Sequence, residues 1–354
     1  LSELETYPII EQISKMKLMP CEIDIGEMVV HLLVNKNLDA EHYVSKMLES
    51  QQRTKRSYPL RPKDVVLYGF GRIGRLLTRI LVSDTGAGIK WRLRAVVVRD
   101  SNHQDDLIKR ASLLRNDSVH GTFPGTIRVN KNNNSLIVNG NEIFFINSND
   151  PRKVNYKQYG IKKATLIDNT GVWTDEEGLS KHVKNPSVDR VILTAPAKGK
   201  IKNIVFGIND ERLKGDEKIV GAASCTTNAI TPPLRLIDDA YKIQSGHIET
   251  IHAYTNDQNL VDNYHKSDRR GRSAALNLVI TNTGAAKAVS DVIPELKGKL
   301  TANAIRVPTP NVSLAIMNLN LKKSVGVEEL NELFKQAAFH SNLKTIIDLS
   351  LIHI

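Results

Sequence analysis

A glycine loop between an apolar strand and a helical pattern constrains the fold of this chain more than any other feature. Val65-Val-Leu-Tyr68 predicts a short buried strand, the loop Gly69-Phe-Gly71-Arg-Ile-Gly74 follows it, and apolar residues then recur at helical spacing from Ile73 to Val82. Trp91 to Val98 predicts the next strand. A strand, a helix and a second strand in this order form the unit from which parallel sheets are built. Later apolar runs extend the sheet at Ala164–Ile167, Val191–Thr194 and Lys218–Ala222.

The spacing of the glycines indicates a dinucleotide-binding loop. Gly69 allows the tight turn, Gly71 lets a pyrophosphate approach the backbone, and Gly74 permits close packing of the helix on the strand. The pyrophosphate would rest on the N–H groups at the start of the helix. Asp100, at the end of the second strand, is placed to bind the adenosine ribose hydroxyls and favours NAD, whereas its neighbour Arg99 would favour NADP. An ordinary strand-to-helix turn is the alternative for the loop taken alone.

A candidate nucleophile lies where the last of these strands gives way to a helix. Cys225 stands in Ala223-Ser-Cys-Thr-Thr-Asn228. The N–H groups and the positive dipole end of a helix start lower the pKa of a thiol and stabilise a developing oxyanion. His252 follows 27 residues later as a candidate base. Most free cysteines are buried and inert, but a nucleophile, a base and a dinucleotide loop in one chain favour covalent redox chemistry at an aldehyde carbon.

Other kinds of site find less support in the sequence. His247 and His252 are five residues apart, which fits neither one face of a strand nor the spacing of zinc-binding helices, and two cysteines cannot build a structural zinc site. We therefore expect no metal. Part of the net charge of +11 is concentrated between Arg53 and Lys63, where a solvated basic linker is favoured over a nucleic-acid or membrane patch. Anionic small molecules account for the general positive surplus.

The bulk properties describe an ordinary globular chain. Its 354 residues, 41% apolar and 25% charged, are typical of a protein with about two domains. No apolar run approaches the roughly 18 residues of a spanning helix, and no secretory signal is visible. Two cysteines without paired spacing fit a reducing compartment, so the cytoplasm is the expected location and Cys21 is expected to be a small buried hydrophobe.

The chain is expected to have three parts. Residues 1–63 predict a small helical extension, which opens with the capping pair Ser2 and Glu5 and ends in the basic linker. Residues 64–224 predict a Rossmann-type domain with a doubly wound parallel sheet. Residues 225–354 predict an α+β catalytic domain with a mixed sheet. Its strand and helix patterns lie at His247–Tyr254, Asn303–Val307, Val312–Leu321 and Val327–Ala338.

Several motifs together resemble glyceraldehyde-3-phosphate dehydrogenase, and they occur in the order of that family. They are Tyr68-Gly-Phe-Gly-Arg-Ile-Gly-Arg75, Asp117-Ser-Val-His-Gly121, Leu193-Thr-Ala-Pro196, Ala223-Ser-Cys-Thr-Thr-Asn228, Thr283-Gly-Ala-Ala-Lys287 and Arg306-Val-Pro-Thr309. The resemblance covers roughly residues 64 to 345 and is to the bacterial long type with an N-terminal extension. It implies a phosphorylating enzyme of glycolysis and gluconeogenesis that forms a homotetramer and uses NAD, with NADP left open.

The mechanism implied by the resemblance begins at Cys225. Its thiolate adds to the aldehyde to give a hemithioacetal, and hydride then passes to the nicotinamide while His252 takes the hydroxyl proton. Inorganic phosphate cleaves the resulting thioester to an acyl phosphate, 1,3-bisphosphoglycerate. The implied partners are therefore a small phosphorylated aldehyde and inorganic phosphate.

The binding positions of the family carry over residue by residue. For the cofactor they are Gly69, Phe70, Gly71, Arg72, Ile73, Gly74, Asp100, Thr170, Gly171, Trp173 and Thr194. For the substrate phosphate they are Thr255, Asp257 and Arg306, and for the attacking phosphate Ser224, Thr226, Arg270, Thr283 and Gly284. Strand-end or core packing is the alternative for Trp173 and for the threonines taken singly.

Two other functions stay open at this point. Erythrose-4-phosphate dehydrogenase shares the cysteine and the histidine but hydrolyses its thioester, and Thr283-Gly284 favours the phosphate-using branch. A non-catalytic RNA-binding relative would use the basic surface, but Cys225 and His252 are intact and the sequence has no aromatic-rich RNA-binding motif. The last strand, the Asn-bearing turn and the long final helix of the family are not found before Ile354, so we expect the catalytic domain to be incomplete and the chain as given to fold poorly or turn over weakly.

Overall fold

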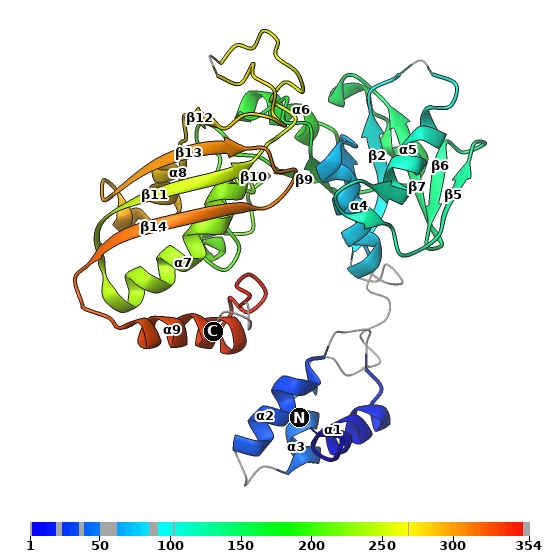
Figure 1. The fold of residues 1–354 in the computed structure, drawn as a ribbon. Coiled ribbons are helices and arrows are strands. Elements are labelled where there is room, and N and C mark those ends of the chain that lie inside the picture. The colour runs from blue at the N-terminus through cyan, green and yellow to red at the C-terminus, as the bar shows by residue number, and fades with distance from the viewer. Residues whose placement is uncertain are drawn as a thin grey trace. The chain divides into compact units, whose positions relative to one another are not determined.

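The computed structural model describes residues 2–18, 23–34, 39–49, 62–84, 91–101, 103–267 and 269–349, and the chain divides into two units (Figure 1). The first unit contains the N-terminal helices. The second contains both large sheets. Cys21 and most of the predicted basic linker lie outside the described residues.

The first unit is helical, as its capping pattern predicts. The Ser2 hydroxyl accepts a hydrogen bond from the Glu5 N–H at 3.3 Å, and the Glu5 carboxylate accepts one from the Ser2 N–H at 2.6 Å, which completes a capping box. Ile9, Val29 and Val44 are buried together, so a small apolar core stabilises helices that would be marginal alone. The helices are α1 (Glu3–Lys15), α2 (Ile25–Val34) and α3 (Ala40–Met47).

The first large sheet has the strand order β10-β9-β8-β1-β2-β7-β6-β5 in the described part of the chain. Its strands are β1 (Lys63–Tyr68), β2 (Trp91–Val98), β5 (Ile127–Asn130), β6 (Ser135–Val138), β7 (Asn141–Asn147), β8 (Ala164–Asp168), β9 (Val188–Leu193) and β10 (Ile219–Gly221). The pairs β1 with β8, β8 with β9, β9 with β10 and β2 with β7 are parallel. An order that runs outward in both directions from β1 is that of a doubly wound sheet, which confirms the predicted Rossmann-type fold.

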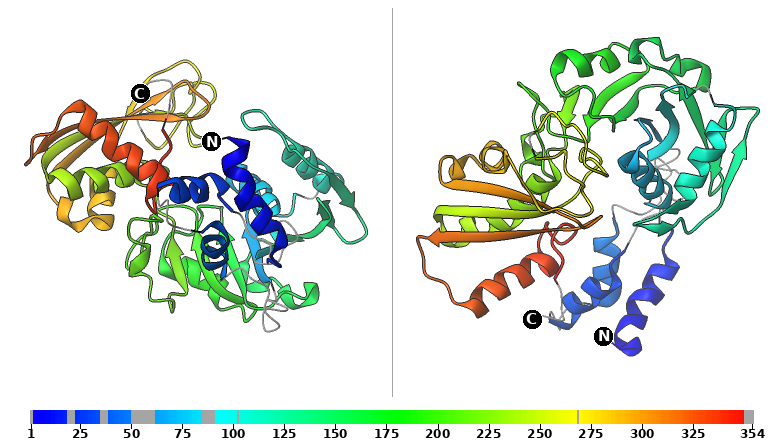
Figure 2. Two further views of the ribbon diagram at one scale, coloured as in Figure 1. Left: turned by 90° about the horizontal axis from the view of Figure 1, so that it is seen from below. Right: turned by 45° about the horizontal axis from the view of Figure 1, so that its top comes forward.

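Helices cover both faces of this sheet (Figure 2). Successive side chains of its central strands point to opposite sides, so each face has its own apolar cluster. Leu67 belongs to the apolar cluster that α4 (Arg72–Asp84) and α5 (Asp106–Arg115) complete. Val66 belongs to the cluster on the other side, to which α6 (Glu176–Val183) contributes. The near-continuous apolar run of β1 is therefore explained by burial on both faces.

The antiparallel edge of this sheet was missed by the sequence prediction, which named no strand between Val98 and Ala164. β7 lies parallel to β2, but β6 and β5 continue the sheet in antiparallel pairs. Asn139 and Gly140 make the turn between β6 and β7, with φ of +46° and +82°. An Asn-Gly pair with positive φ at both positions is the preferred two-residue hairpin turn. The sheet is thus wider than predicted.

The second large sheet is mixed, as predicted for the C-terminal part. β11 pairs in parallel with β13 and antiparallel with β14, and the order is β12-β13-β11-β14. The elements are α7 (Cys225–Tyr241), β11 (Ile243–Ala253), β12 (Val279–Thr281), α8 (Ala285–Val292), β13 (Leu300–Val307), β14 (Ser313–Leu321) and α9 (Val327–His340). The helices contribute to one apolar cluster with the sheet. The expected domain boundary between residues 224 and 225 stays a prediction.

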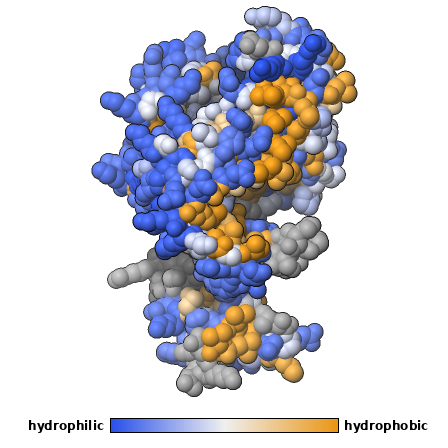
Figure 3. All heavy atoms as spheres, turned by 60° about the vertical axis from the view of Figure 1, so that its left-hand side comes forward, coloured by the Kyte–Doolittle hydropathy of each residue, from blue (hydrophilic) through white to orange (hydrophobic). Residues whose placement is uncertain are grey.

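One face of the second sheet keeps apolar side chains at the surface. Ala302 and Met317 pack into the cluster with the helices, whereas Leu314 and Ile316 of β14 and Ile280 of β12 are exposed. Figure 3 brings this side of the molecule forward and shows apolar side chains gathered there. Gathered apolar side chains at a surface are typical of a site that binds another protein.

The remaining elements are short. They are the ribbon of β3 (Asn116–Asp117) and β4 (Gly121–Thr122) and 3₁₀ turns at Pro151–Lys153, Tyr156–Tyr159, Asp210–Arg212 and Pro294–Leu296. No helix within the described residues is long and apolar enough to cross a bilayer.

A series of buried hydrogen bonds connects α6 to the end of β8. The side chains of Asp168 and His182 are fully buried, with Asp168 Oδ2 3.0 Å from His182 Nε2. The other carboxylate oxygen accepts hydrogen bonds from the backbone N–H and the hydroxyl of Thr170, at 2.8 and 2.6 Å. The His182 ring also lies edge-on to Tyr68 and Trp173. The pair therefore fixes the loop that follows β8.

Replacement of His182 is expected to destabilise the fold. In His182→Leu the buried Asp168 carboxylate loses one donor, which should lower the free energy of unfolding by about 2–4 kcal/mol. Urea unfolding followed by circular dichroism measures this value. Lys184→Leu, at the exposed end of α6, is the matched control and should change stability by no more than about 0.5 kcal/mol. Equal losses in the two variants would contradict the role given to the pair.

Candidate active site

Cys225 is the first residue of α7 and follows the carboxyl end of β10. Ala223 has φ +56°, an uncommon value for a residue with a side chain, and it turns the chain sharply between the two elements. The Ser224 hydroxyl caps the helix by accepting a hydrogen bond from the Thr227 N–H at 3.0 Å. The structure thus places an exposed thiol at a helix N-terminus, beside N–H groups that have no acceptor within the helix.

His252 lies beside the thiol, near the end of β11. Its Nε2 is 3.4 Å from Cys225 Sγ. This hydrogen bond is the main cause that lowers the pKa of the Cys225 thiol, helped by the Thr226 N–H and opposed by the loss of water around the sulfur. The same bond raises the pKa of His252. Both directions favour a thiolate paired with an imidazolium.

Arg306 completes the cluster from the neighbouring strand. β11 and β13 are parallel, and their register pairs His252 with Arg306. The Nη1 atom of Arg306 lies 2.7 Å from His252 Nδ1, and it donates a hydrogen bond to the Ala253 carbonyl oxygen at 3.0 Å. Burial is the main cause that lowers the pKa of the guanidinium, and the charge of Arg270 adds to it. A half-buried arginine therefore lies beside the imidazole. Its guanidinium can donate hydrogen bonds to an anion in the cavity.

A cavity of about 310 Å³ opens in front of the sulfur. It brings together most of the predicted catalytic and phosphate positions, which are Ser224, Cys225, Thr226, His252, Thr283, Gly284 and Arg306. The predicted residues near Cys225, His252 and Thr283 and the predicted Arg306 come from separate segments of the sequence. The structure makes them neighbours in space. The cavity is large enough for a small molecule, and the Arg306 guanidinium on its wall suits an anionic one.

The other predicted phosphate residues lie outside this cavity. Arg270 forms an ion pair with Asp257 and donates to the Thr281 hydroxyl at 2.9 Å. Thr255 is exposed at the start of the same loop. Since Thr281 lines the cavity, Arg270 reaches its rim through that hydroxyl. The structure keeps Asp257 and Arg270 together but does not bring Thr255 to the cavity wall.

A second cavity, of about 570 Å³, lies over the glycine loop. Of the predicted cofactor positions it includes Gly69, Phe70, Gly71, Thr170 and Trp173. The others do not line it. Arg72 donates instead to the Pro310 carbonyl oxygen at 3.5 Å, and Thr194 donates to the Asp168 carbonyl oxygen at 3.1 Å. Ile73, Gly74, Asp100 and Gly171 are likewise absent from the cavity wall.

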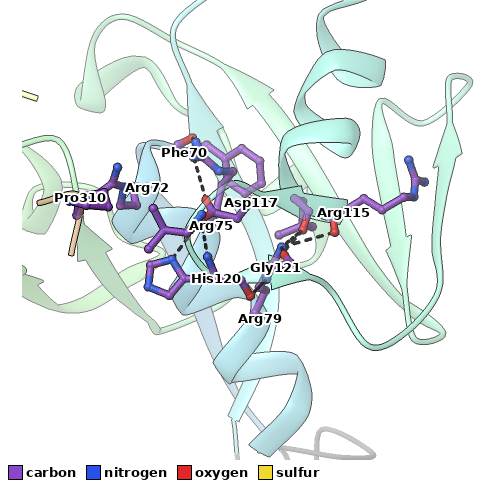
Figure 4. A network of polar contacts seen from close by, with 11 residues as sticks. Phe70, Arg72, Arg75, Arg79, Arg115, Asp117, His120, Gly121 and Pro310 are labelled. Carbon is purple, nitrogen blue, oxygen red and sulfur yellow. Dashed lines mark hydrogen bonds and ion pairs between the residues drawn. The ribbon is translucent and has the colours of Figure 1, made fainter. Parts of the chain in front are cut away.

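Figure 4 shows how the glycine loop is supported by the motif Asp117–Gly121. Arg75 on α4 lies 3.6 Å from the Asp117 carboxylate and donates to the Phe70 carbonyl oxygen at 3.5 Å. Asp117 also accepts a hydrogen bond from the His120 N–H at 2.9 Å, which is the main cause that holds the pKa of Asp117 well below its usual range. The carboxylate therefore stays charged and anchors the arginine that holds the loop.

Comparisons with known proteins match two parts of the chain. Residues 63–176 match the NAD binding domain of glyceraldehyde 3-phosphate dehydrogenase, and residues 224–352 match its C-terminal domain. A glyceraldehyde-3-phosphate dehydrogenase-like protein of Pseudomonas aeruginosa (strain UCBPP-PA14) is 56% identical over 349 residues, which is 98% of this chain and 76% of the relative. The chain belongs to the glyceraldehyde-3-phosphate dehydrogenase family.

Further relatives carry the name of that enzyme. Glyceraldehyde-3-phosphate dehydrogenase 1 of Bacillus cereus is 41% identical, over 80% of this chain and 80% of its own length. The chloroplastic glyceraldehyde-3-phosphate dehydrogenase B of Pisum sativum is 42% identical, over 80% of this chain and 61% of its own length. Membership confirms the resemblance drawn from the motifs. It also supports an NAD-binding oxidoreductase of the glycolytic type.

The glycine loop fits the NAD that the glyceraldehyde-3-phosphate dehydrogenase family uses. A Cβ at Gly71 would meet no other atom within 4 Å, so the backbone there is open to a ligand. A Cβ at Gly74 would clash with the carbonyl oxygen of Gly69, so that glycine is required by packing of the helix on the loop. No group of three or more His, Cys, Asp or Glu within the described residues is placed to hold a metal ion.

Several residues at the two cavities were not singled out from the sequence. Thr250 and Thr281 line the cavity in front of Cys225, and Arg110 and Asn169 line the one over the glycine loop. The position of Asn169 could have been inferred, because it directly follows β8 at the ligand-binding edge of the sheet. Thr250 lies inside β11, Thr281 is the last residue of β12 and Arg110 is on α5. The sequence alone gives no signal of a site at these three positions.

Proposed function

We propose that this chain is a phosphorylating glyceraldehyde-3-phosphate dehydrogenase that works through a thioester on Cys225. The observation that carries the proposal is the position of the sulfur. It lies at the N-terminus of α7, 3.4 Å from His252 Nε2, on the wall of a 310 Å³ cavity that Arg306 also lines. Covalent oxidation of an aldehyde needs a nucleophile, a base and donors for a developing oxyanion at one place.

In the proposed reaction, the Cys225 thiolate attacks the aldehyde carbon as the carbonyl π bond opens, and the oxygen takes a proton from the His252 imidazolium. The product is a hemithioacetal. Bound NAD supplies the acceptor for the hydride that leaves this carbon. His252 takes back the hydroxyl proton as the C=O bond re-forms, which gives the thioester. Inorganic phosphate then attacks the thioester carbon, and the sulfur leaves as a thiolate, which releases an acyl phosphate and restores the site.

Two anions must be held for this sequence. Arg306 is proposed to bind the substrate phosphate, together with Thr255 of the neighbouring loop, and Asp257 of that loop is proposed to act through its ion pair with Arg270. The attacking phosphate is proposed to bind at Ser224, Thr226, Thr283, Gly284 and Arg270. Support for the second set is that its first four members line one cavity with the sulfur, and that Arg270 reaches the rim of that cavity through Thr281.

A pair of glycine variants tests the cofactor loop. Gly71→Ala is expected to leave the fold intact but to raise the Kd for NAD by at least about tenfold, because the added methyl group projects toward the pyrophosphate path. Gly74→Ala is expected to lower the free energy of unfolding by about 1–3 kcal/mol, because its methyl group clashes with the backbone of Gly69. Calorimetric binding and urea unfolding of both variants measure these effects. The reverse pattern would contradict the proposed loop.

Dependence on phosphate tests the reaction itself. NADH formation from glyceraldehyde 3-phosphate is followed at 340 nm with and without inorganic phosphate. Turnover beyond one equivalent of the enzyme should require phosphate. Equal steady-state rates in its absence would instead support the hydrolytic chemistry of an erythrose-4-phosphate dehydrogenase.

Assembly into a homotetramer is also proposed, and the exposed apolar side chains Ile280, Leu314 and Ile316 support an interface on the second sheet.

A further inference from the structure

A further cavity, of about 490 Å³, is lined by α8 and by the segment that connects β9 to β10. Its wall carries four cations, which are Lys198, Lys202, Arg212 and Lys287. Asp291 is the only carboxylate among the described residues of the wall, so four positive charges against one negative charge give a formal charge of +3. A concave surface with such an excess of positive charge attracts small anions, and we refer to it as the cationic cavity.

Three of the four cations are not neutralised by a carboxylate in the described part of the chain. There, the ammonium groups of Lys198 and Lys287 have no hydrogen-bond or ion-pair partner, and both side chains are exposed. The guanidinium of Arg212 donates to a backbone carbonyl oxygen of α8 at 3.4 Å. Lys202 differs, because its Nζ lies 2.6 Å from Glu217 Oε1. Lys198, Arg212 and Lys287 therefore have donors for a ligand.

Two asparagine side chains hold the segment that carries Lys198. The Asn203 side chain accepts a hydrogen bond from the Ala197 N–H at 2.8 Å and donates one to the Ala197 carbonyl oxygen at 2.9 Å. Asn209 is buried, and its side chain accepts from the Val205 N–H at 2.8 Å and donates to the Asn203 carbonyl oxygen at 3.1 Å. The backbone on this side of the cavity is therefore fixed before a ligand binds, which favours binding.

The cationic cavity is distinct from the two cavities of the proposed reaction. Pro196 lines the cavity in front of Cys225, whereas Lys198 lines the cationic cavity. On α8, Ala288 lines the former and Lys287 the latter. None of the four cations lines the cavity in front of the sulfur or the cavity over the glycine loop. Binding at this site would therefore be independent of the proposed oxidation of the aldehyde.

We propose that the cationic cavity binds a small soluble anion that carries two or more linked phosphate groups. Its three free cations come from separate segments, which are the loop after β9, the 3₁₀ turn Asp210–Arg212 and α8. An exposed ion pair contributes little by itself, so a ligand must meet several of these cations at once. Linked phosphates carry several charges and many acceptor oxygens, which suits them to this wall. No described residue of the wall is aromatic, so the phosphate groups are recognised and a base is not.

Isothermal titration calorimetry of the whole chain with inorganic tripolyphosphate tests this site. Saturating NAD⁺ is present to occupy the glycine loop, and the ionic strength is low, so that exposed charges are not screened. Tripolyphosphate is expected to bind with a Kd below about 1 mM. Lys198→Gln and Lys287→Gln should each raise this Kd by about threefold, and the double variant by about tenfold. Lys157→Gln removes an exposed lysine outside the cavity and is the matched control, which should leave the Kd within about 1.5-fold.

Two further titrations separate this site from other places that could hold phosphate groups. Arg306→Gln changes the cavity in front of Cys225 and should leave the Kd for tripolyphosphate within about twofold. ATP presents a triphosphate on a nucleoside. It should bind no more than about threefold more tightly than tripolyphosphate, because the wall offers no aromatic ring to a base.

Four results would overturn the proposed phosphate site. The first is no binding of tripolyphosphate at about 1 mM. The second is an equal rise of the Kd in Lys157→Gln, because the anion would then be attracted by the overall charge of the chain. The third is a Kd that rises in Arg306→Gln but not in the two lysine variants, which would place the anion in front of Cys225 and leave the proposed function standing. The fourth is tighter binding of ATP than the stated limit. Circular dichroism shows whether each variant is folded.

Discussion

Cys225→Ser is expected to abolish aldehyde-dependent NADH formation. A serine hydroxyl keeps the shape of the side chain, but its pKa lies far above that of the thiol, so almost no oxyanion is available as nucleophile at neutral pH. Loss of a covalent nucleophile should lower kcat by about a thousandfold or more. The rate is measured at saturating glyceraldehyde 3-phosphate, NAD and phosphate, and the Kd for NAD is expected to stay unchanged.

The chain provides its own matched control for this variant. Cys21→Ser makes the same chemical change at the other of the two cysteines in the sequence and should leave kcat within about twofold. Both variants are also compared by urea unfolding. A Cys225→Ser protein that is folded, binds NAD and still turns over at more than a tenth of the wild-type rate would contradict the covalent route.

His252→Asn is expected to lower kcat by about a hundredfold to ten-thousandfold, because it removes the group that moves the proton. It should also change the thiol. In the wild type the hydrogen bond between the two side chains lowers the pKa of Cys225 and raises the pKa of His252, and both directions favour the thiolate paired with the imidazolium. Without the imidazole the pKa of the thiol rises toward its ordinary value. The pH profile of iodoacetamide alkylation should therefore move to higher pH.

The control for this variant lies on the same strand. His247 of β11 is hydrogen-bonded through Nδ1 to the Thr301 hydroxyl at 2.7 Å, outside the cavity in front of the sulfur. His247→Asn should leave kcat and the alkylation profile of Cys225 unchanged. An alkylation profile that does not move in His252→Asn would show that the helix terminus alone activates the thiol. The same result would remove His252 from the account of thiol activation.

The parts of the fold that the sequence predicts well are those specified by short segments. The strand and helix on either side of Gly69–Gly74, and the start of α7 at Cys225, each depend on residues within one or two turns of the chain. An apolar run of four residues, a glycine at a required turn and a Ser cap are local signals. The resemblance to the family then predicts that these segments contribute to one site.

The parts that the sequence could not predict depend on distant segments. The ion pair of Arg270 with Asp257 and the position of Asp100 on the wall of a separate cavity follow from loop paths that no local pattern specifies. Ala223 at φ +56° is another case, because a residue with a Cβ is not expected there. The Asn139-Gly140 turn, by contrast, is a hairpin signal that the sequence itself carries.

Mass spectrometry of the chain after one turnover shows whether a thioester forms on Cys225. The protein is mixed with glyceraldehyde 3-phosphate and NAD in the absence of phosphate, quenched in acid and digested. A 3-phosphoglyceryl adduct is expected on the peptide that contains Cys225, and this adduct should be lost when phosphate is added before the quench. NADH formation with no adduct on that peptide, or with the adduct on another residue, would contradict a thioester on Cys225.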